Sequence, residues 1–181
     1  AAIEAEPEGH SDYVSALVTF LNPATGALRV VTGSHDHIIR VWDADTGGAL
    51  LVLGGHTRWV RALAFFTSPA TGELRLVSGS DDNTVRVWNP AASGAAIEAE
   101  PEGHTGDVEA LVTFVDPATG ALRVATGGGS FDGTIRVWDA ETGGALLVIK
   151  EWASALVVFK DPATGAPRLV TDSGKVFDPV A

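Results

Sequence analysis

The chain has 181 residues, of which 45% are hydrophobic and 19% are charged, a composition that indicates a folded domain and excludes a disordered chain. The formal net charge of −11 predicts repulsion from phosphate backbones and acidic membrane surfaces, so we expect neither nucleic acid nor a membrane as a partner. No apolar run approaches the roughly 20 residues of a membrane-spanning helix, and the absence of Cys excludes disulfides, thiolate metal ligands and Cys nucleophiles.

The first residues, AAIEAE, show neither the basic start nor the apolar stretch of a secretory signal. The sequence therefore leaves the compartment unknown, with a slight preference for the cytoplasm.

Residues 14–53 form the first copy of a repeated unit, and this copy divides into four short strand-like segments. Residues 14–20, 28–32, 38–42 and 49–53 are rich in Val, Ile, Leu, Thr and aromatic residues. Turns that carry Pro, Asn, Asp and Gly separate these segments. No stretch keeps a 3.6-residue apolar period, so we predict an all-β chain with about four strands in each repeat.

The same order of segments returns three more times along the chain. The phrase PATG occurs four times, at Pro23, Pro69, Pro117 and Pro162. Gly-His opens three repeats, and AAIEAEPEGH at residues 1–10 returns intact at 95–104. Four antiparallel strands in ~40–45 residues are typical of a β-propeller blade. We predict a single domain, residues 1–181, with blades at about 10–53, 56–100, 104–149, and 150–181 together with 1–6.

The fourth repeat departs from the others. It lacks Gly-His, its turn at residues 172–174 is short, and Phe177 stands where the other repeats have Trp. The chain stops in a third-strand segment, whereas residues 1–6 copy the fourth-strand segment at 95–100. We therefore expect a degenerate last blade that an N-terminal strand completes, which would also remove an exposed sheet edge.

The repeats resemble the WD40 family. The resemblance depends on Gly-His at the start of a repeat, Trp-Asp near its end, and VSGSDDNTVRVW at residues 77–88, and it covers nearly the whole chain. It implies a hydrogen-bonded tetrad in each blade, made by the motif His, a second-strand Ser or Thr, a turn Asp and a third-strand Trp. The matching residues are His10, Thr32, Asp36 and Trp42, then His56, Ser78, Asp82 and Trp88, then His104, Thr126, Asp132 and Trp138.

A His, an Asp and a Ser together also suggest a catalytic triad. The set recurs in three repeats, however, and a structural role explains the recurrence, because buried polar groups satisfy one another. In the fourth repeat the tetrad cannot form. The GGGS run at residues 127–130 lacks the Lys and the helix of a phosphate-binding loop. No unrepeated acid–base cluster stands out, so we expect no enzymatic activity and no cofactor.

Two turns carry residue types that bind metals. His35, Asp36 and His37 suggest zinc, but Asp36 belongs to a tetrad and the two His residues are weak support. Asp81, Asp82 and Asn83 suggest calcium, but the Gly and distal Glu of an EF-hand loop are missing. We assign no metal site.

The residues just after each Gly-His differ between repeats, although the repeats agree almost everywhere else. In the resemblance these residues lie on the upper face, across which the family mainly binds its partners. Aromatic residues and Arg are enriched in binding hot spots. The candidate binding residues are Tyr13, Ser15, Arg58, Trp59, Arg61, Asp107, Glu109 and Trp152.

We therefore expect a non-catalytic scaffold that binds a protein or peptide partner. A lectin-like or small-ligand propeller is one alternative, and a designed or recently amplified repeat protein without a specialised ligand is another. Four blades of this shape would leave a wide gap, so we expect a homodimer that completes an eight-bladed ring. A four-bladed monomer and a piece of a longer ring are the other arrangements open at this point.

Overall fold

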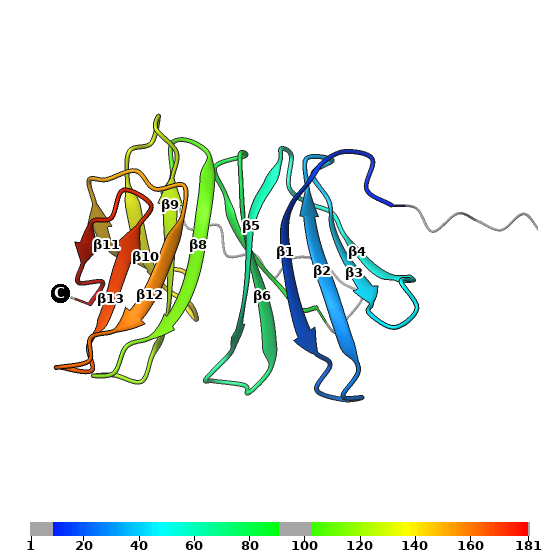
Figure 1. The fold of residues 1–181 in the computed structure, drawn as a ribbon, viewed down its shortest axis with the longest axis horizontal. Coiled ribbons are helices and arrows are strands. Elements are labelled where there is room, and N and C mark those ends of the chain that lie inside the picture. The colour runs from blue at the N-terminus through cyan, green and yellow to red at the C-terminus, as the bar shows by residue number, and fades with distance from the viewer. Residues whose placement is uncertain (1–8, 91–102, 181) are drawn as a thin grey trace, which may run out of the picture.

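The computed structural model describes residues 9–90 and 103–180, which form strands and turns and contain no helix long and apolar enough to cross a membrane. Four antiparallel sheets, one from each repeat, stand side by side in chain order (Figure 1). Blade 1 has β1 (Val14–Leu21), β2 (Leu28–Ser34), β3 (Ile39–Asp43) and β4 (Ala49–Leu53). Blade 2 has β5 (Val60–Thr67), β6 (Leu74–Ser80) and β7 (Val85–Trp88). Blade 3 has β8 (Val108–Val115), β9 (Leu122–Gly128), β10 (Ile135–Asp139) and β11 (Ala145–Ile149). Blade 4 has β12 (Leu156–Lys160), β13 (Pro167–Thr171) and β14 (Val176–Phe177).

The all-β class and the four blades predicted from the sequence are confirmed. The predicted fourth strands at residues 1–6 and 95–100 lie outside the described residues. In the described part of the chain, blades 2 and 4 therefore have three strands each, ordered β5-β6-β7 and β12-β13-β14. Consecutive strands within each blade are antiparallel neighbours, as short turns require.

The PATG turns connect the first and second strands of every blade at the lower end of the molecule in Figure 1. The Gly of each phrase has φ between 70° and 71°, a left-handed conformation that costs Gly little. In blade 1 the Gly26 amide donates to the carbonyl of Asn22 at 2.7 Å, and the Asn22 side chain accepts the Ala24 amide at 2.9 Å. Each turn therefore sets the register of one strand pair. We call the opposite end, which carries the loops after Gly-His, the upper face.

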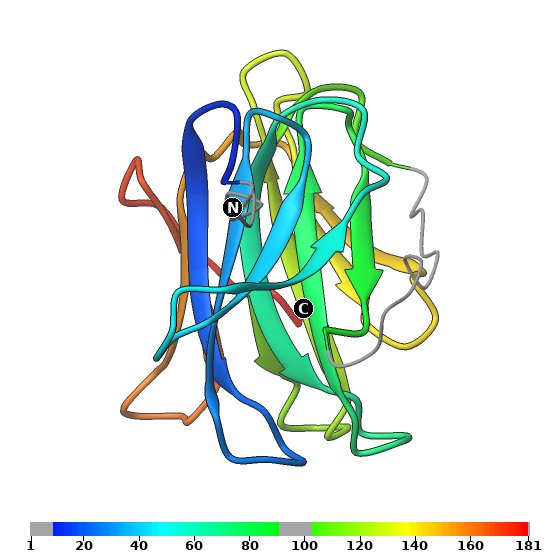
Figure 2. The same cartoon turned by 90° about the vertical axis from the view of Figure 1, so that its right-hand side faces the viewer.

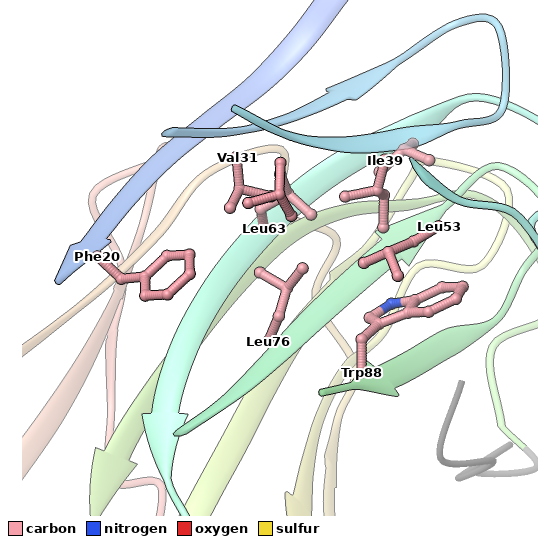
Figure 3. Close-up of a cluster of buried hydrophobic side chains, with 9 residues drawn as sticks. Phe20, Val31, Ile39, Leu53, Leu63, Leu76 and Trp88 are labelled. Carbon is pink, nitrogen blue, oxygen red and sulfur yellow. The ribbon is translucent and has the colours of Figure 1, made fainter. Parts of the chain in front are cut away.

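Neighbouring blades pack face to face through buried apolar side chains. Figure 3 shows one such cluster, where Val31 and Ile39 of blade 1 meet Leu76 and Trp88 of blade 2. Similar clusters join blade 2 to blade 3 and blade 3 to blade 4. The first strands of successive blades contact one another in the order β1, β5, β8, β12, so they form the inner side of the arc, while β4 lies away from it (Figure 2).

The two ends of the arc leave apolar faces uncovered. Leu17 of blade 1 is 62% exposed, whereas Leu63, at the same position in blade 2, is 8% exposed because blade 1 covers it. Phe159 of blade 4 is 44% exposed, whereas its counterpart Phe114 in blade 3 is 7% exposed. Blade 1 therefore lacks a preceding blade and blade 4 lacks a following one within the described residues.

Candidate functional site

The polar tetrad of blade 2 joins three parts of the blade. His56 Nδ1 lies 2.8 Å from Asp82 Oδ2, and His56 Nε2 lies 2.7 Å from Ser78 Oγ. The Trp88 indole N–H donates to the same Ser78 oxygen at 2.8 Å. In blade 1, His10 meets Asp36, Thr32 and Trp42 through contacts of 2.9, 2.7 and 2.7 Å, and in blade 3 His104 meets Asp132, Thr126 and Trp138 through contacts of 2.8, 2.7 and 2.8 Å.

The donor and acceptor roles in this tetrad follow from the carboxylate and the indole. A carboxylate can only accept, so His56 Nδ1–H donates to Asp82, and Nε2 of the neutral imidazole accepts the hydrogen bond of the Ser78 hydroxyl. An indole nitrogen can only donate, so the Ser78 oxygen accepts the Trp88 N–H. Every polar atom is used, and Ser78 is fully buried. This geometry holds strands together and leaves the hydroxyl no route to a substrate.

Burial also sets the charge state of the blade 3 tetrad. Burial lowers the pKa of His104 below its ordinary value, although Asp132 favours the charged imidazole. Burial acts to raise the pKa of Asp132, but hydrogen bonds from Thr134, Thr105 and His104 outweigh it and lower this pKa to about 2. The pair at neutral pH is therefore a neutral imidazole beside a carboxylate.

Blade 4 replaces the tetrad with a smaller contact. Thr171, at the position of Thr126, is buried, and its hydroxyl lies 2.8 Å from the hydroxyl of Ser173. Phe177 occupies the position of the indole and has no N–H to donate. The Thr171 hydroxyl also accepts the Lys175 amide at 3.3 Å, so both of these hydrogen bonds lie within one turn and do not tie three parts of the blade together.

On the upper face, a β-bulge in each first strand of blades 1 to 3 presents a different side chain. The bulges contain Ser15, Arg61 and Glu109. Ser15 donates a hydrogen bond to the Val60 carbonyl of the next blade, and Arg61 binds both carboxylate oxygens of Asp81, at 2.8 and 3.0 Å. Burial raises the pKa of the Glu109 carboxyl, partly offset by Arg61. The same bulge position thus carries a hydroxyl in blade 1, a cation in blade 2 and an acid in blade 3.

An aromatic stack crosses the boundary between blades 1 and 2. The His35 ring lies parallel to the Trp59 ring, with centroids 4.0 Å apart and planes 3° apart. On the other side of the stack, the Tyr13 ring packs edge-on against the His35 ring, with centroids 5.9 Å apart. The Arg61 guanidinium lies 4.7 Å from the centroid of the Trp59 ring. Trp59 is still 40% exposed. Such a held, half-exposed indole is preorganised to contact a partner.

A depression of about 440 Å³ opens beside this stack, and we call it the upper hollow. Residues from blades 1, 2 and 3 line it: His37, Thr57, Arg58, Trp59, Arg61, Asp81 and Asp107. Its size falls within the range of ligand pockets. Both signs of charge and one aromatic ring therefore line one depression.

The structure places the eight predicted upper-face residues in two groups. Arg58, Trp59, Arg61 and Asp107 line the upper hollow. The others lie on the same face but outside its lining: Tyr13, Ser15, Glu109 and Trp152. Trp152 is about half-exposed, so it is available for contact away from the hollow.

Four residues of this site were not among the predicted binding residues: His35 in the aromatic stack, and His37, Thr57 and Asp81 in the lining of the upper hollow. His35 and Asp81 occupy the same turn position, where their amides donate to the carbonyls of Tyr13 and Trp59 at 2.9 Å. The signal that could have found them is variation between repeats at this turn.

The turns considered for metals are engaged in other contacts. His35 stacks on Trp59, and Asp81 pairs with Arg61. Within residues 9–90 and 103–180, no three His, Asp or Glu side chains gather as a set of metal ligands.

A comparison with known protein families identifies the family of this chain. The profile of the family "WD domain, G-beta repeat" (WD40) matches residues 3–43, 47–89 and 97–139. The chain belongs to the WD40 repeat family. The profile matches blades 1 to 3 and leaves out the fourth repeat, the one without a tetrad. No curated protein sequence matches the chain.

Two solved structures similar to this WD40 chain are designed proteins. The crystal structure of the computationally designed Ika4 protein has 31% sequence identity and a TM-score of 0.68, and the match covers 94% of this chain and 92% of Ika4. The computationally designed Ika8 protein has 32% identity and a TM-score of 0.68, over 96% of this chain but 48% of Ika8. The chain therefore spans about half the length of Ika8.

Proposed function

We propose that this WD40 chain is a non-catalytic interaction scaffold that binds a protein or peptide partner through its upper face. The observation that carries the proposal is a contrast between positions. The tetrads repeat in blades 1 to 3, whereas the exposed positions beside them carry different side chains in every blade. A rigid frame that presents unlike side chains is what specific recognition needs, and the WD40 family generally mediates protein interactions.

The upper hollow supplies the anchor for such a partner. Trp59 offers a half-exposed indole that His35 holds in place, and Arg58 offers a cation at the rim. Asp107 of blade 3 lines the same hollow and carries the opposite charge. A peptide with an apolar side chain between an acidic and a basic residue fits this arrangement by charge.

A peptide display library tests this proposal. Peptides selected on the wild-type chain should bind Trp59→Ala at least about 10-fold more weakly, because a central aromatic anchor contributes 2 kcal/mol or more to binding. Leu146→Ala is the control, because Leu146 is an apolar residue of β11 that is 54% exposed and lies outside the upper hollow. Peptides that bind both variants as tightly as the wild type would refute the proposal.

We also propose that a second copy of the chain is a partner, in an eight-bladed ring with two-fold symmetry. The uncovered faces support this, because Leu17 and Phe159 occupy positions that are buried between blades elsewhere in the same chain. Blade 1 of one copy could therefore cover the free face of blade 4 of the other copy, in the way that neighbouring blades cover each other within the chain. The similarity to Ika8, a chain about twice as long, also supports it.

The designed neighbours favour one further candidate, a designed or recently amplified repeat protein without a specialised ligand. The display experiment separates the two candidates, since a self-assembling chain without a specialised ligand would enrich no peptide that depends on Trp59.

A further inference from the structure

The second strands of blades 1 to 3 carry a glycine at the point where the next blade approaches. A Cβ on Gly33 would lie 2.6 Å from the Val60 side chain of blade 2, and a Cβ on Gly79 would lie 2.7 Å from the Val108 side chain of blade 3. Any larger side chain at this position would overlap the first strand of the next blade. The glycine therefore makes room for the blade that follows.

Blade 4 has Asp172 at the position of this glycine. Thr32 in blade 1 and Thr171 in blade 4 each pair with the leucine that precedes the first-strand Phe by three residues, so Asp172 corresponds to Gly33. Leu169 packs toward blade 3, and side chains alternate along a strand, so Asp172 belongs to the opposite, free face of blade 4. The last blade thus carries an exposed carboxylate where the other blades leave space.

A hydrogen bond beside this position differs in the same way. Ser15 of blade 1 donates to the Val60 carbonyl of blade 2, across the blade boundary. Ser154 is the counterpart of Ser15 in blade 4, and its hydroxyl donates to Asp172 Oδ2 at 2.6 Å instead. This bond lowers the pKa of Asp172, so its carboxyl is ionised at neutral pH. The hydroxyl that reaches the next blade at the first boundary is therefore engaged within blade 4.

The rest of the free face of blade 4 is apolar. Val157, Phe159 and Val176 are 56%, 44% and 55% exposed. Their counterparts in blade 1 all pack in the cluster at the boundary with blade 2: Val18, Phe20 and Val41. The face therefore attracts a partner blade over most of its area and opposes it at Asp172.

We infer that Asp172 weakens the contact between two copies of the chain, so that the ring closes less tightly than the blades pack within one chain. This inference rests on the proposed ring of two chains, in which Val14 of one copy approaches Asp172 of the other, as Val60 approaches Gly33. Docking removes water from the carboxylate and places an apolar side chain beside it. A charge that loses water without gaining a partner opposes association.

Dissociation constants of the full chain with itself test this inference, measured by sedimentation equilibrium over a range of concentrations. Asp172→Gly restores the residue of blades 1 to 3 and should tighten association at least about 10-fold. Asp172→Asn keeps the size of the side chain and removes its charge. It should change association in the same direction, even where Asp172→Gly does not fold.

Asp45→Gly is the matched control, because it removes the same charge from an exposed residue in the turn between β3 and β4. It should leave the dissociation constant unchanged at physiological salt, where distant charges are screened. An equal effect of Asp45→Gly and Asp172→Gly would mean that net charge, and not the contact at Asp172, limits association.

A double-mutant cycle tests whether Val14 meets position 172 of the other copy. Val14→Ala should weaken association in the Asp172→Gly chain, where Val14 fills the space beside the glycine, and should weaken it less in the wild type. Equal effects in both chains would overturn the inferred contact.

The outcomes separate this inference from the proposed ring. A wild-type dimer that neither Asp172→Gly nor Asp172→Asn tightens overturns the inference and leaves the ring intact. A wild-type monomer that becomes a dimer with Asp172→Gly supports the inference and overturns the wild-type ring. Monomers of the wild type and of both variants overturn the ring and the inference together.

Discussion

One hydroxyl oxygen in each tetrad carries two hydrogen bonds from different parts of the blade. In blade 2 the Ser78 hydroxyl accepts a hydrogen bond from the Trp88 indole N–H and donates one to His56 Nε2. All three side chains are buried. Removing the hydroxyl would leave two polar nitrogens without a partner in a site that water does not reach, which is costly for folding.

We therefore expect Ser78→Ala to lower the free energy of unfolding by about 1–3 kcal/mol. Urea denaturation followed by tryptophan fluorescence measures this change. Thr67→Ala is the control, because Thr67 is an exposed strand residue outside the tetrads, and it should change stability by less than about 0.5 kcal/mol. Equal stability of Ser78→Ala and wild type would mean that the tetrad is not a structural bond.

The tetrads also predict how stability depends on pH. The pKa of Asp132 is lowered in the folded chain to about 2, so its stabilising contribution is present above the unfolded pKa and is lost as the pH falls through the range from about 4 to 2. The pKa of His104 is also lowered, so the unfolded chain binds a proton first and stability already begins to fall below about pH 6.5.

Urea titrations at intervals from pH 7 to pH 3 should show a steady fall in the free energy of unfolding. His104→Gln removes one titrating group, so its curve should be flatter between pH 6.5 and 5 than that of the wild type. A wild-type stability that rises as the pH falls through this range would contradict the assigned neutral imidazole.

At the scale of the element, the second strands carry a Gly where the next blade approaches. A Cβ on Gly33 or Gly79 would meet a Val side chain of the following blade at 2.6 or 2.7 Å. A Cβ on Gly127 would lie 2.3 Å from the Ala153 carbonyl oxygen, which belongs to the backbone. Side chains can turn aside, but the Ala153 carbonyl can move only with the backbone that connects β11 to β12.

We expect Gly127→Ala to destabilise the chain by about 1–3 kcal/mol, the usual cost of overpacking, and by more than Gly33→Ala. Thermal unfolding by circular dichroism compares the two. Gly54→Ala is the control, because a Cβ there meets its nearest neighbour at an ordinary 3.7 Å. If Gly127→Ala and Gly54→Ala unfold at the same temperature, blades 3 and 4 are not packed as closely as described.

At the scale of the whole molecule, apolar side chains are uncovered on both end faces of the arc. Leu17 lies on the free face of blade 1, and Phe159 lies on the free face of blade 4. Burying them against a second copy would repeat the packing that already joins neighbouring blades within the chain.

Sedimentation equilibrium at micromolar concentration should therefore give twice the chain mass of 18.7 kDa. Leu17→Asp and Phe159→Asp place a charge in the proposed interface, so each should shift the chain toward the monomer. Phe131→Asp makes the same change at an exposed loop residue and should leave the dimer intact. A wild-type monomer at this concentration rules out the ring of two chains.

The sequence by itself determined the strands, the blades and the members of each tetrad. These features are local or repeated: strand segments alternate with Pro and Gly turns, and His56, Ser78, Asp82 and Trp88 recur at nearly fixed spacing. A spacing that recurs in three repeats indicates contact, because each repeat folds in the same way.

Only the tertiary structure decided which side chains meet across blade boundaries. The stack of His35 on Trp59 joins positions that do not correspond between repeats. The repeat pattern describes one blade at a time. Contacts between blades depend on the bulges in the first strands, on the rotation of one sheet relative to the next, and on the volumes of the two side chains that meet. Packing between unlike side chains is therefore a property of the assembled blades.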